Sequence, residues 1–461
     1  MLVRSSLIVA CASLVGCANY TSDGRVPDAG FDASVVSDAT TESDAQAEPV
    51  CGKTQVYCKP NCIDCDVQGA IDTSRLSFTC GEQGACVVGC ASPYSACQVS
   101  GNSRCLDLKS DSYHCGSCER ACGSGTNDPG TCNQGQCVAK AVTSLGDTTG
   151  SFLLHSTGKM YFHDKKSVYR CDLPECTNRE ALYSGTFEAL PLPQGLVIAP
   201  AAGVTHIYFL GKQSGSTTTS LARCPILGTC TEPEIYVANM PSVALFGSSD
   251  GLFTFDGAKL FSIALVSNPA SATRFEIAKY KWVPTRFTFT ADGIFDASIE
   301  NGVHRSPRTA CSNPDTNPCS PDSFVDPSRA RPTTIEAKGE VLYFNDSVTG
   351  GIYSCPPSGC ANPITQVVST QLGTESLHTD GFGLAWTYRS ANGLADEVRM
   401  CTPSGGACAA SKVFTVAAQQ RNATQVRLGT KSALYWLSTG ADDSDAGTTA
   451  AIRRTFAPNG K

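Results

Sequence analysis

The sequence carries little charge and has no basic patch. Only 17% of its 461 residues are charged, and 35 Lys and Arg against 42 Asp and Glu give a net charge of −7. No cluster of Lys or Arg occurs along the chain. Because proteins that bind nucleic acids must neutralise many phosphates, this composition excludes nucleic acid as a partner.

Several functional patterns are also missing. After the N-terminal leader no stretch reaches the roughly 18 consecutive apolar residues of a membrane-spanning helix. No phosphate-binding loop or EF-hand spacing occurs, and the six histidines include no H-x-x-x-H pair. We therefore expect no cofactor and no dedicated metal site.

The first residues have the features of an export signal. Arg4 precedes a short apolar run at residues 7–10, and Leu14-Val15-Gly16-Cys17 follows. These four residues resemble the lipobox of bacterial lipoproteins, which implies removal of residues 1–16 and lipidation of Cys17. The resemblance places the protein in the cell envelope, at the outer membrane or cell surface, with its lipid as the membrane attachment. An ordinary secretory peptide with an incidental cysteine is the alternative.

Residues 17–50 form an acidic tether. Residues 18–50 hold seven acidic side chains against one basic side chain, Arg25, and few large apolar residues. Burial could not offset the entropy lost on ordering such a segment, so we expect it to be disordered and extended.

Cysteine is abundant, with 26 residues in the chain, and this favours an oxidising compartment. Fourteen of them lie within residues 51–137, where few large apolar residues occur. We expect disulfides to replace a hydrophobic core there. The pairing cannot be read from the spacing, which leaves the connectivity open. The C-x-x-C pairs Cys62/Cys65 and Cys115/Cys118 could instead hold zinc, but they are fifty residues apart and only His114 is nearby.

Part of this module resembles a known cysteine pattern. The segment from Cys105 to Cys137 includes Cys115-Gly-Ser-Cys118 and Cys132-Asn-Gln-Gly-Gln-Cys137. It is similar to the stigma-specific-protein type of repeat found in secreted proteins and lipoproteins of myxobacteria. That family implies no chemistry, so we interpret the module as a rigid spacer or contact surface.

Residues 138–461 contain a repeat rich in β-branched and aromatic residues. An apolar and aromatic strand core recurs at intervals of 42 to 50 residues, after a turn signal in each copy. The cores are centred on Tyr161, Tyr208, Phe253, Phe295, Tyr343, Trp386 and Trp436.

A pair of nearby cysteines follows the next strand in five copies. Four to seven residues separate the two cysteines, which suits a hairpin loop closed by a disulfide. The pairs are Cys171-Cys176, Cys224-Cys230, Cys311-Cys319, Cys355-Cys360 and Cys401-Cys408.

Repeats of this length with three or four strands are typical of an all-β fold, the β-propeller. We predict seven blades, with six as the alternative, preceded by the disulfide-rich module. The last copy ends after its third strand, so residues 138–142 are expected to supply the fourth and close the ring.

Two of the strand cores resemble the YWTD repeat of receptor propellers. They are Tyr161-Phe162-His163-Asp164 and Tyr343-Phe344-Asn345-Asp346, and the resemblance implies a structural role for the two aspartates. The looped cysteine pairs resemble those of uncharacterised propeller lipoproteins of myxobacteria. Propeller lyases similar to the streptogramin-inactivating family use a histidine in the central channel, where equivalent positions of successive blades converge.

Catalytic motifs are weak. Gly247-Ser248-Ser249-Asp250-Gly251 matches G-x-S-x-G, but a strand follows it and no helix does. Ser156-Thr157-Gly158-Lys159 matches S-x-x-K within a repeat turn. The histidines are scattered, at His114, His155, His163, His206, His304 and His378.

These observations favour an envelope lipoprotein that displays a propeller for binding a protein or a glycan. The alternative is a propeller lyase or hydrolase acting on an extracellular polymer or small molecule, and it predicts a cluster of His, Glu or Arg at one mouth of the channel. The binding hypothesis predicts a contiguous exposed apolar patch. A purely structural envelope protein would have neither.

Overall fold

The structure is a computed structural model. It describes residues 50–456, except residues 54, 59–60, 65–72, 82–84, 100–101, 119, 124–129, 147–149, 191, 193, 249–250, 309–319, 361–362, 370, 381–382, 390–395, 405, 421, 430–432 and 440–449. Cys17 and the acidic tether lie outside the described residues, apart from Val50.

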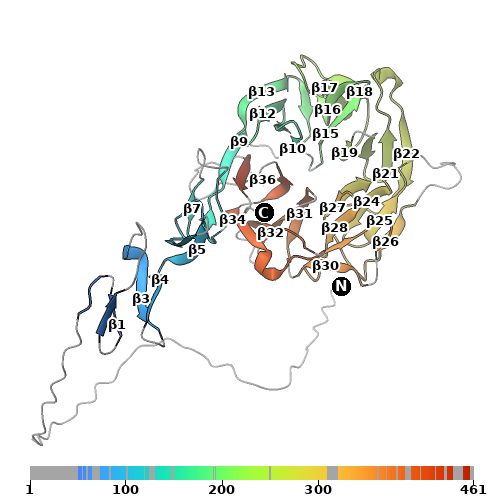
Figure 1. The fold of residues 1–461 in the computed structure, drawn as a ribbon. Coiled ribbons are helices and arrows are strands. Elements are labelled where there is room, and N and C mark those ends of the chain that lie inside the picture. Colours follow the sequence, from blue (N-terminus) through green and yellow to red (C-terminus); the bar gives the residue numbers. More distant parts are fainter. Residues whose placement is uncertain are drawn as a thin grey trace, which may run out of the picture. The chain divides into compact units, whose positions relative to one another are not determined.

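The chain from residue 140 onward is a seven-bladed β-propeller, which confirms the predicted fold class (Figure 1). The first three blades are antiparallel sheets. In the first and third, four strands follow one another outward from the centre. In the second, the first two strands both pair with the third, and two more strands follow outward. Their strands are β10 (Phe152–His155), β11 (Lys159–His163), β12 (Ser167–Asp172) and β13 (Thr177–Ser184); β14 (Phe187–Ala189), β15 (Leu196–Ala201), β16 (Val204–Gln213), β17 (Ser220–Pro225) and β18 (Glu234–Val237); β19 (Ala244–Ser248), β20 (Gly251–Phe255), β21 (Lys259–Ile263) and β22 (Arg274–Lys279).

The next three blades repeat the four-stranded pattern. Their strands are β23 (Arg286–Thr290), β24 (Gly293–Ser298), β25 (Gly302–Ser306) and β26 (Asp322–Val325); β27 (Ile335–Lys338), β28 (Val341–Asn345), β29 (Ile352–Cys355) and β30 (Thr365–Val368); β31 (Thr374–Thr379), β32 (Leu384–Arg389), β33 (Asp396–Cys401) and β34 (Phe414–Gln420).

The seventh blade joins both ends of the propeller sequence. It contains β35 (Thr424–Leu428), β36 (Ala433–Thr439), β37 (Ala450–Phe456) and, as its outer strand, β9 (Lys140–Gly146). Strand β9 pairs antiparallel with β37, placing Ala141 opposite Arg453. The predicted closure by an N-terminal strand is thus confirmed, although the strand runs to residue 146 rather than ending at residue 142. Strand β35 also lies beside β10, so the inner strands form a complete ring.

The apolar core lies between neighbouring blades. Each of seven buried clusters joins residues of two adjacent sheets, as where Trp386 packs with Ile352 and where Trp436 packs with Ala385. Each of the seven predicted strand cores lies in the strand that pairs with the inner strand of its blade, which is β16 in the five-stranded second blade. Burial of such large aromatic side chains is the main favourable contribution to docking one blade on the next.

The cysteine pairs of the blades form disulfides. The bonds described are Cys171–Cys176, Cys224–Cys230, Cys355–Cys360 and Cys401–Cys408. Cys311 and Cys319 lie outside the described residues. Each described pair closes the loop between the last two strands of its blade. Arg170 of the first blade donates a hydrogen bond to the carbonyl of Ile226, which lies in the disulfide-closed loop of the second blade. These loops therefore also connect neighbouring blades.

The segment before the propeller is built from small hairpins and disulfides. Its strands are β1 (Gln55–Cys58), β2 (Asn61–Asp64), β3 (Leu76–Cys80), β4 (Cys86–Cys90), β5 (Ser95–Val99), β6 (Asn102–Leu106), β7 (Cys132–Asn133) and β8 (Gln136–Cys137). Its described disulfides are Cys90–Cys105, Cys97–Cys118, Cys115–Cys132 and Cys122–Cys137. Its buried cluster among the described residues consists of cysteines, so crosslinks take the place of a core there.

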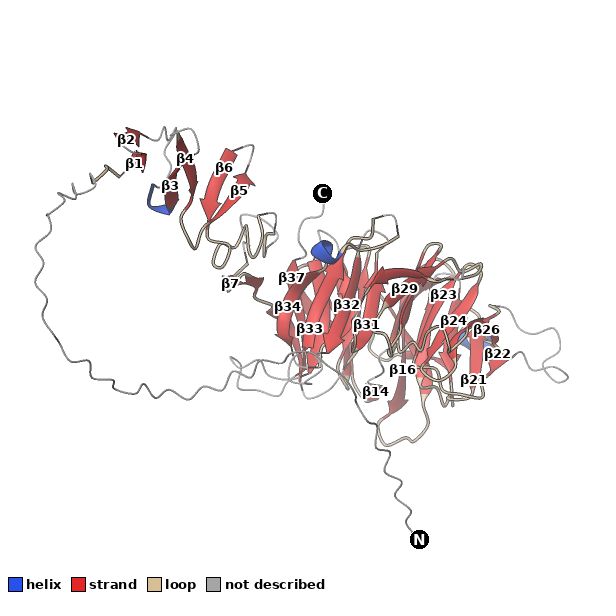
Figure 2. Cartoon of the chain, turned by 90° about the horizontal axis from the view of Figure 1, so that it is seen from below, coloured by secondary structure: helices blue, strands red, loops and turns tan. Residues whose placement is uncertain are grey.

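Helix is confined to three short 3₁₀ turns in the described part of the chain, and strands dominate Figure 2. The turns are η1 (Thr73–Arg75), η2 (Pro269–Ser271) and η3 (Ala410–Lys412). None of the helical segments described is long or apolar enough to span a bilayer.

Candidate functional site

The register of the blades aligns seven positions around the central channel. In each blade one residue of the inner strand pairs with the first residue of the strand core, as Glu336 does with Tyr343. In the sixth and seventh blades, where the core is Ala385-Trp386 and Tyr435-Trp436, that first residue is Ala385 or Tyr435. Because inner strands line the channel of a propeller, these positions form one layer around it. We call this layer the channel ring; it comprises Leu153, Val197, Phe246, Thr288, Glu336, His378 and Arg427.

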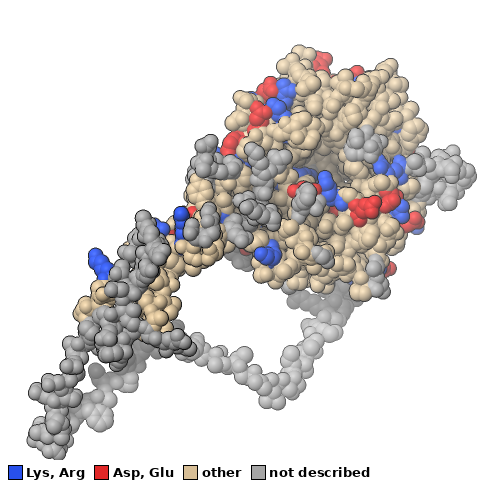
Figure 3. All heavy atoms as spheres, viewed as in Figure 1, with Lys and Arg blue, Asp and Glu red and all other residues tan. Residues whose placement is uncertain are grey.

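The channel ring is divided into two halves. The first three blades supply only apolar side chains, and the other four supply polar or charged ones. Consecutive blades are neighbours, so each half is a continuous sector of the channel wall. A cavity of about 270 Å³ opens between them and includes Val197, Phe246 and Glu336 in its lining. The molecule is visibly hollowed near the centre of the propeller in Figure 3, with acidic and basic side chains beside the hollow.

Arg286 also lines this cavity. It lies in β23, two residues before Thr288 of the channel ring. Five other blades place small residues at that position: Ser151, Gly195, Ala244, Thr334 and Ser376. The seventh blade has a register shift there, between Thr424 and Arg427. Arg286 is therefore the one long charged side chain among these six aligned positions.

The Arg286 side chain is buried, and its guanidinium is not fully hydrogen-bonded. The residue is 7% exposed, and its Nε has no hydrogen-bond partner among the described residues. Burial, followed by repulsion from Arg427, lowers the pKa of Arg286 to about 10, against the attraction of Glu336. Arg286 thus stays charged at neutral pH, next to a second cation.

Glu336 and Arg427 bring opposite charges to the channel ring. Burial raises the pKa of Glu336, although Arg427 and Arg286 oppose this shift. Burial also lowers the pKa of Arg427, and Glu336 opposes that shift. The Arg427 Nη1 donates to the carbonyl of Val426 at 2.9 Å, which leaves its remaining N–H groups available to a ligand.

His378 approaches Glu336 with the ring nitrogen that carries its proton. Its Nδ1 accepts the backbone N–H of Leu428 at 3.1 Å, and its Nε2 lies 3.9 Å from Glu336 Oε1. Burial, together with Arg427 and Arg286, holds the pKa of His378 well below its usual value, so the ring is neutral at pH 7. A neutral imidazole that accepts at Nδ1 carries its proton on Nε2. His378 therefore presents an N–H, and no lone pair, toward Glu336.

The other five histidines, all of them described, do not belong to the channel ring. His155 and His206 bond to Thr157 and to the carbonyl of Val204, in their own hairpins. His304 is buried in the fourth blade, 3.4 Å from Asp296. His114 lies in the module, beside Asp111.

His163 and Ser151 form a buried pair that resembles a nucleophile with its base. The Ser151 Oγ lies 3.0 Å from His163 Nε2, and the imidazole Nδ1 lies 3.0 Å from the carbonyl of Asp164. The Ser151 N–H also donates to the same Nε2. In the fifth blade Asn345 accepts the backbone N–H groups of Thr333 and Thr334 in the equivalent way. The pair is therefore a structural clamp between the first two strands of a blade.

The aspartates of the strand cores stabilise turns. Asp164 Oδ1 accepts the N–H groups of Lys166 and Ser167. Asp346 accepts the N–H of Val348 and the hydroxyl of Thr349. Asp256 has the same role in the third blade, where its Oδ1 accepts the backbone N–H of Lys259. Its strand core was not among those that resemble the YWTD repeat. This is the structural role that the resemblance implied.

The two serine motifs lie in hairpins. Gly247 and Gly251 belong to β19 and β20, which pair directly, and Ser249 lies outside the described residues. Ser156 lies in the turn between β10 and β11, where Lys159 pairs with Asp172. No helix follows either motif, so neither has the strand-to-helix context of a nucleophile elbow.

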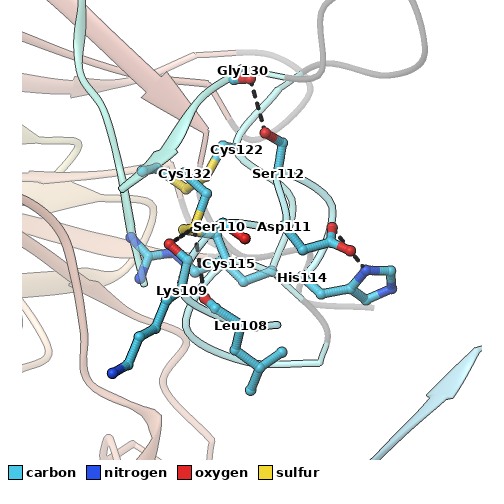
Figure 4. Close-up of a disulfide and its surroundings, with 12 residues drawn as sticks. Leu108, Lys109, Ser110, Asp111, Ser112, His114, Cys115, Cys122, Gly130 and Cys132 are labelled. Carbon is cyan, nitrogen blue, oxygen red and sulfur yellow. Dashed lines mark hydrogen bonds and ion pairs between the residues drawn. A yellow bond between two sulfur atoms is a disulfide. The ribbon is translucent and has the colours of Figure 1, made fainter. Parts of the chain in front are cut away.

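The C-x-x-C pair at Cys115 and Cys118 is divided between two disulfides. Cys115 bonds to Cys132, as Figure 4 shows, and Cys118 bonds to Cys97. The sulfur atoms of Cys115, Cys122 and Cys137 lie within 4.8 Å of one another, but all three belong to disulfides. Oxidised sulfurs do not act as zinc thiolates. Cys65 lies outside the described residues, so the other pair is not placed.

Comparisons with known proteins reveal similarity of fold only. No protein-family model matches the chain, and no curated protein matches it significantly. Solved structures similar to it include virginiamycin B lyase from Staphylococcus aureus, with 12% identity, a TM-score of 0.47 and coverage of 69% of this chain and 99% of the lyase. A putative 6-phosphogluconolactonase from Bacteroides uniformis has 13% identity and a TM-score of 0.41, covering 64% of this chain and 88% of that one. The PQQ-bound aldose sugar dehydrogenase from Streptomyces coelicolor has 10% identity and a TM-score of 0.36, covering 69% and 98%. At these identities and TM-scores, none of the three structures assigns this chain a function.

Proposed function

We propose that this protein is a lipid-anchored β-propeller of the bacterial cell envelope whose central channel binds a small ligand. The observation that carries the proposal is the charge gathered in one cavity, where Arg286, Arg427 and Glu336 all belong to the lining and Arg286 is 7% exposed. Burying a charge without compensation is costly, and such groups are concentrated at functional sites.

The envelope location rests on the sequence. The leader and Cys17 resemble a lipoprotein signal, and the numerous disulfides suit an oxidising compartment. A rigid, disulfide-linked module between tether and propeller would hold the propeller away from the membrane.

The size of the cavity bears on the kind of ligand. About 270 Å³ lies just below the usual range of about 300–1,000 Å³ for small-molecule sites. A protein or glycan partner would therefore enter the channel through a single residue or sugar unit. The exposed large apolar side chains of the described residues are spread over the module and several blades, as at Val87, Leu227 and Phe275, which favours the channel over an outer face.

A ligand screen with a blocked channel tests this proposal. Saturation-transfer NMR would compare a mixed fragment library on the full-length protein and on Thr288→Phe, which projects a ring into the cavity. Thr217→Phe makes the same change in an exposed loop and is the matched control. We expect fragments that bind the wild type and the control but not Thr288→Phe, at similar melting temperatures. Binding unaffected by Thr288→Phe, or no binding at all, would contradict the proposal.

A second candidate function is catalysis by a propeller lyase, because Glu336, His378 and Arg427 form the kind of cluster that this alternative requires. Burial raises the pKa of Glu336, which suits a general base. Because the Nε2 of His378 carries the proton, this atom could act only as a hydrogen-bond donor. In this case Glu336→Gln would abolish turnover of a bound substrate and leave its binding largely intact, whereas a ligand that remains unchanged on the wild-type protein would exclude catalysis on it.

A further inference from the structure

The two halves of the channel ring offer different surfaces to one ligand. On the apolar side Phe246 is held rigidly, because its ring stacks on that of Phe287 with centroids 4.8 Å apart. Leu153 and Val197 complete this side, and all three residues line the cavity. An apolar group placed here would lose contact with water on binding, which is favourable.

The opposite side is rich in hydrogen-bond donors. Arg286, Arg427 and Thr288 line this part of the cavity and carry N–H or O–H donors. His378 is not part of the lining, but its protonated Nε2 lies 3.9 Å from the carboxylate of Glu336, which is. Within the cavity lining, two guanidinium charges face the one carboxylate of Glu336. Lys338 also acts on Glu336, but it is exposed and is not part of the lining. One further negative charge would balance the site.

We propose that the ligand of this channel, on the proposed function that the channel binds one, is a small monocarboxylate with an apolar body. Its carboxylate would accept N–H groups of Arg286 and of the neighbouring donors. Its apolar body would lie against Leu153, Val197 and Phe246.

The charge and shape of the site favour a carboxylate over a phosphate. A guanidinium presents paired N–H groups that match the two oxygens of a carboxylate. A phosphate monoester would bring close to two negative charges at pH 7, more than the cavity lining lacks. The apolar half would remain unused by inorganic anions.

Titration of the full-length protein with four probes tests this inference. The probes are benzoate, its neutral analogue benzamide, acetate and inorganic phosphate, followed by calorimetry at pH 7 and constant ionic strength. We expect benzoate to bind at least tenfold more tightly than each of the other three. Benzamide lacks the charge, acetate lacks the apolar body, and phosphate lacks the apolar body and carries excess charge.

Two arginine variants of the fourth blade provide the control. Arg286→Gln removes the buried cation and should weaken benzoate binding at least tenfold, with little effect on benzamide. Arg305→Gln makes the same change where the guanidinium donates to the carbonyl of Asp292 outside the cavity, and it should leave both affinities unchanged. Melting temperatures establish that each variant is folded.

The outcomes separate this inference from the proposed function. Equal affinity for benzoate and benzamide, or for benzoate and phosphate, would overturn the monocarboxylate and leave the channel as a ligand site. Failure of all four probes, while other fragments bind in a manner blocked by Thr288→Phe, would also overturn the inference alone. Failure of the probes and of every fragment would overturn both.

Discussion

The Nδ1 of His378 accepts the backbone N–H of Leu428 at 3.1 Å, a bond between the inner strands of the sixth and seventh blades. This contact fixes the tautomer of the imidazole and the hydrogen-bonding role of the atom that faces Glu336. A histidine at the centre of a propeller is thereby made a donor.

The first prediction concerns this tautomer and its pH dependence. Burial lowers the pKa of His378 in the folded protein, so the unfolded chain takes up a proton below about pH 6.5 that the native ring does not. The contribution of His378 to stability is therefore present above pH 6.5 and is lost as the pH falls toward its folded pKa. ¹⁵N spectra should report the proton on Nε2 at pH 7.

The control for this prediction is His378→Asn, whose Oδ1 can accept the Leu428 N–H without titrating. The fall in free energy of unfolding between pH 6.5 and 5 should be smaller in this variant than in the wild type. An equal fall in both proteins would show that His378 is not protected from protonation.

The second prediction is that the buried charge of Arg286 lowers the stability of the folded protein. Replacing a buried, uncompensated charge by an apolar side chain of similar length is often stabilising. Arg286→Met should increase the free energy of unfolding at pH 7 by about 1–2 kcal/mol. Urea denaturation measures this, and a destabilised variant would indicate that the guanidinium has a compensating partner in the native protein.

The third prediction concerns ring closure. Ala141 lies in β9 opposite Arg453, at the outer strand of the seventh blade. Ala141→Pro should cost about 1–3 kcal/mol, because proline removes a backbone donor from the strand that closes the ring. Ala141→Thr keeps the backbone N–H and should change the urea midpoint little. Similar midpoints for Pro and Thr would mean that β9 does not close the ring.

Much of this architecture could be predicted from the sequence. The strand cores predicted seven blades, because each blade buries an aromatic side chain in the strand next to its inner strand, from Tyr161 to Trp436. The final copy lacks its fourth strand, which would leave one edge of β37 unpaired. Because an exposed strand edge is unfavourable, the sequence predicted that another segment pairs with β37. The pairing of the module cysteines was beyond prediction, because spacing alone does not select one connectivity.

The channel site was missed, although a signal for it exists. Glu336 and His378 each lie seven residues before the first residue of a strand core, and Arg427 lies eight before. A short hairpin makes this spacing nearly constant, so aligning the copies on their cores would have brought the three residues to one position. The burial of Arg286 among small residues needs the three-dimensional structure.

The fourth prediction concerns the remaining cysteines. Peptide mapping under non-reducing conditions should identify Cys311–Cys319 together with the four disulfides already described. Removing both members of the Cys171–Cys176 pair should cost about 2 kcal/mol, the entropy of closing a small loop. Free thiols at Cys311 and Cys319 would contradict the proposed pattern of stapled blades.

The fifth prediction concerns the lipid anchor. The wild-type protein should incorporate radiolabelled palmitate in a bacterial host, and Cys17→Ser should not. Label that persists in the variant would rule out Cys17 as the site of attachment, whereas Cys11→Ser, within the leader, should behave as the wild type.

The central claim is that the charged channel binds a ligand through Arg286. ¹H–¹⁵N spectra resolve arginine Nε–H signals, and the Arg286 signal is identified by its absence in Arg286→Gln. The account predicts that this signal shifts in a saturable way during titration with benzoate, and that benzamide leaves it in place. An Arg286 signal that does not move while benzoate binds elsewhere would contradict the account.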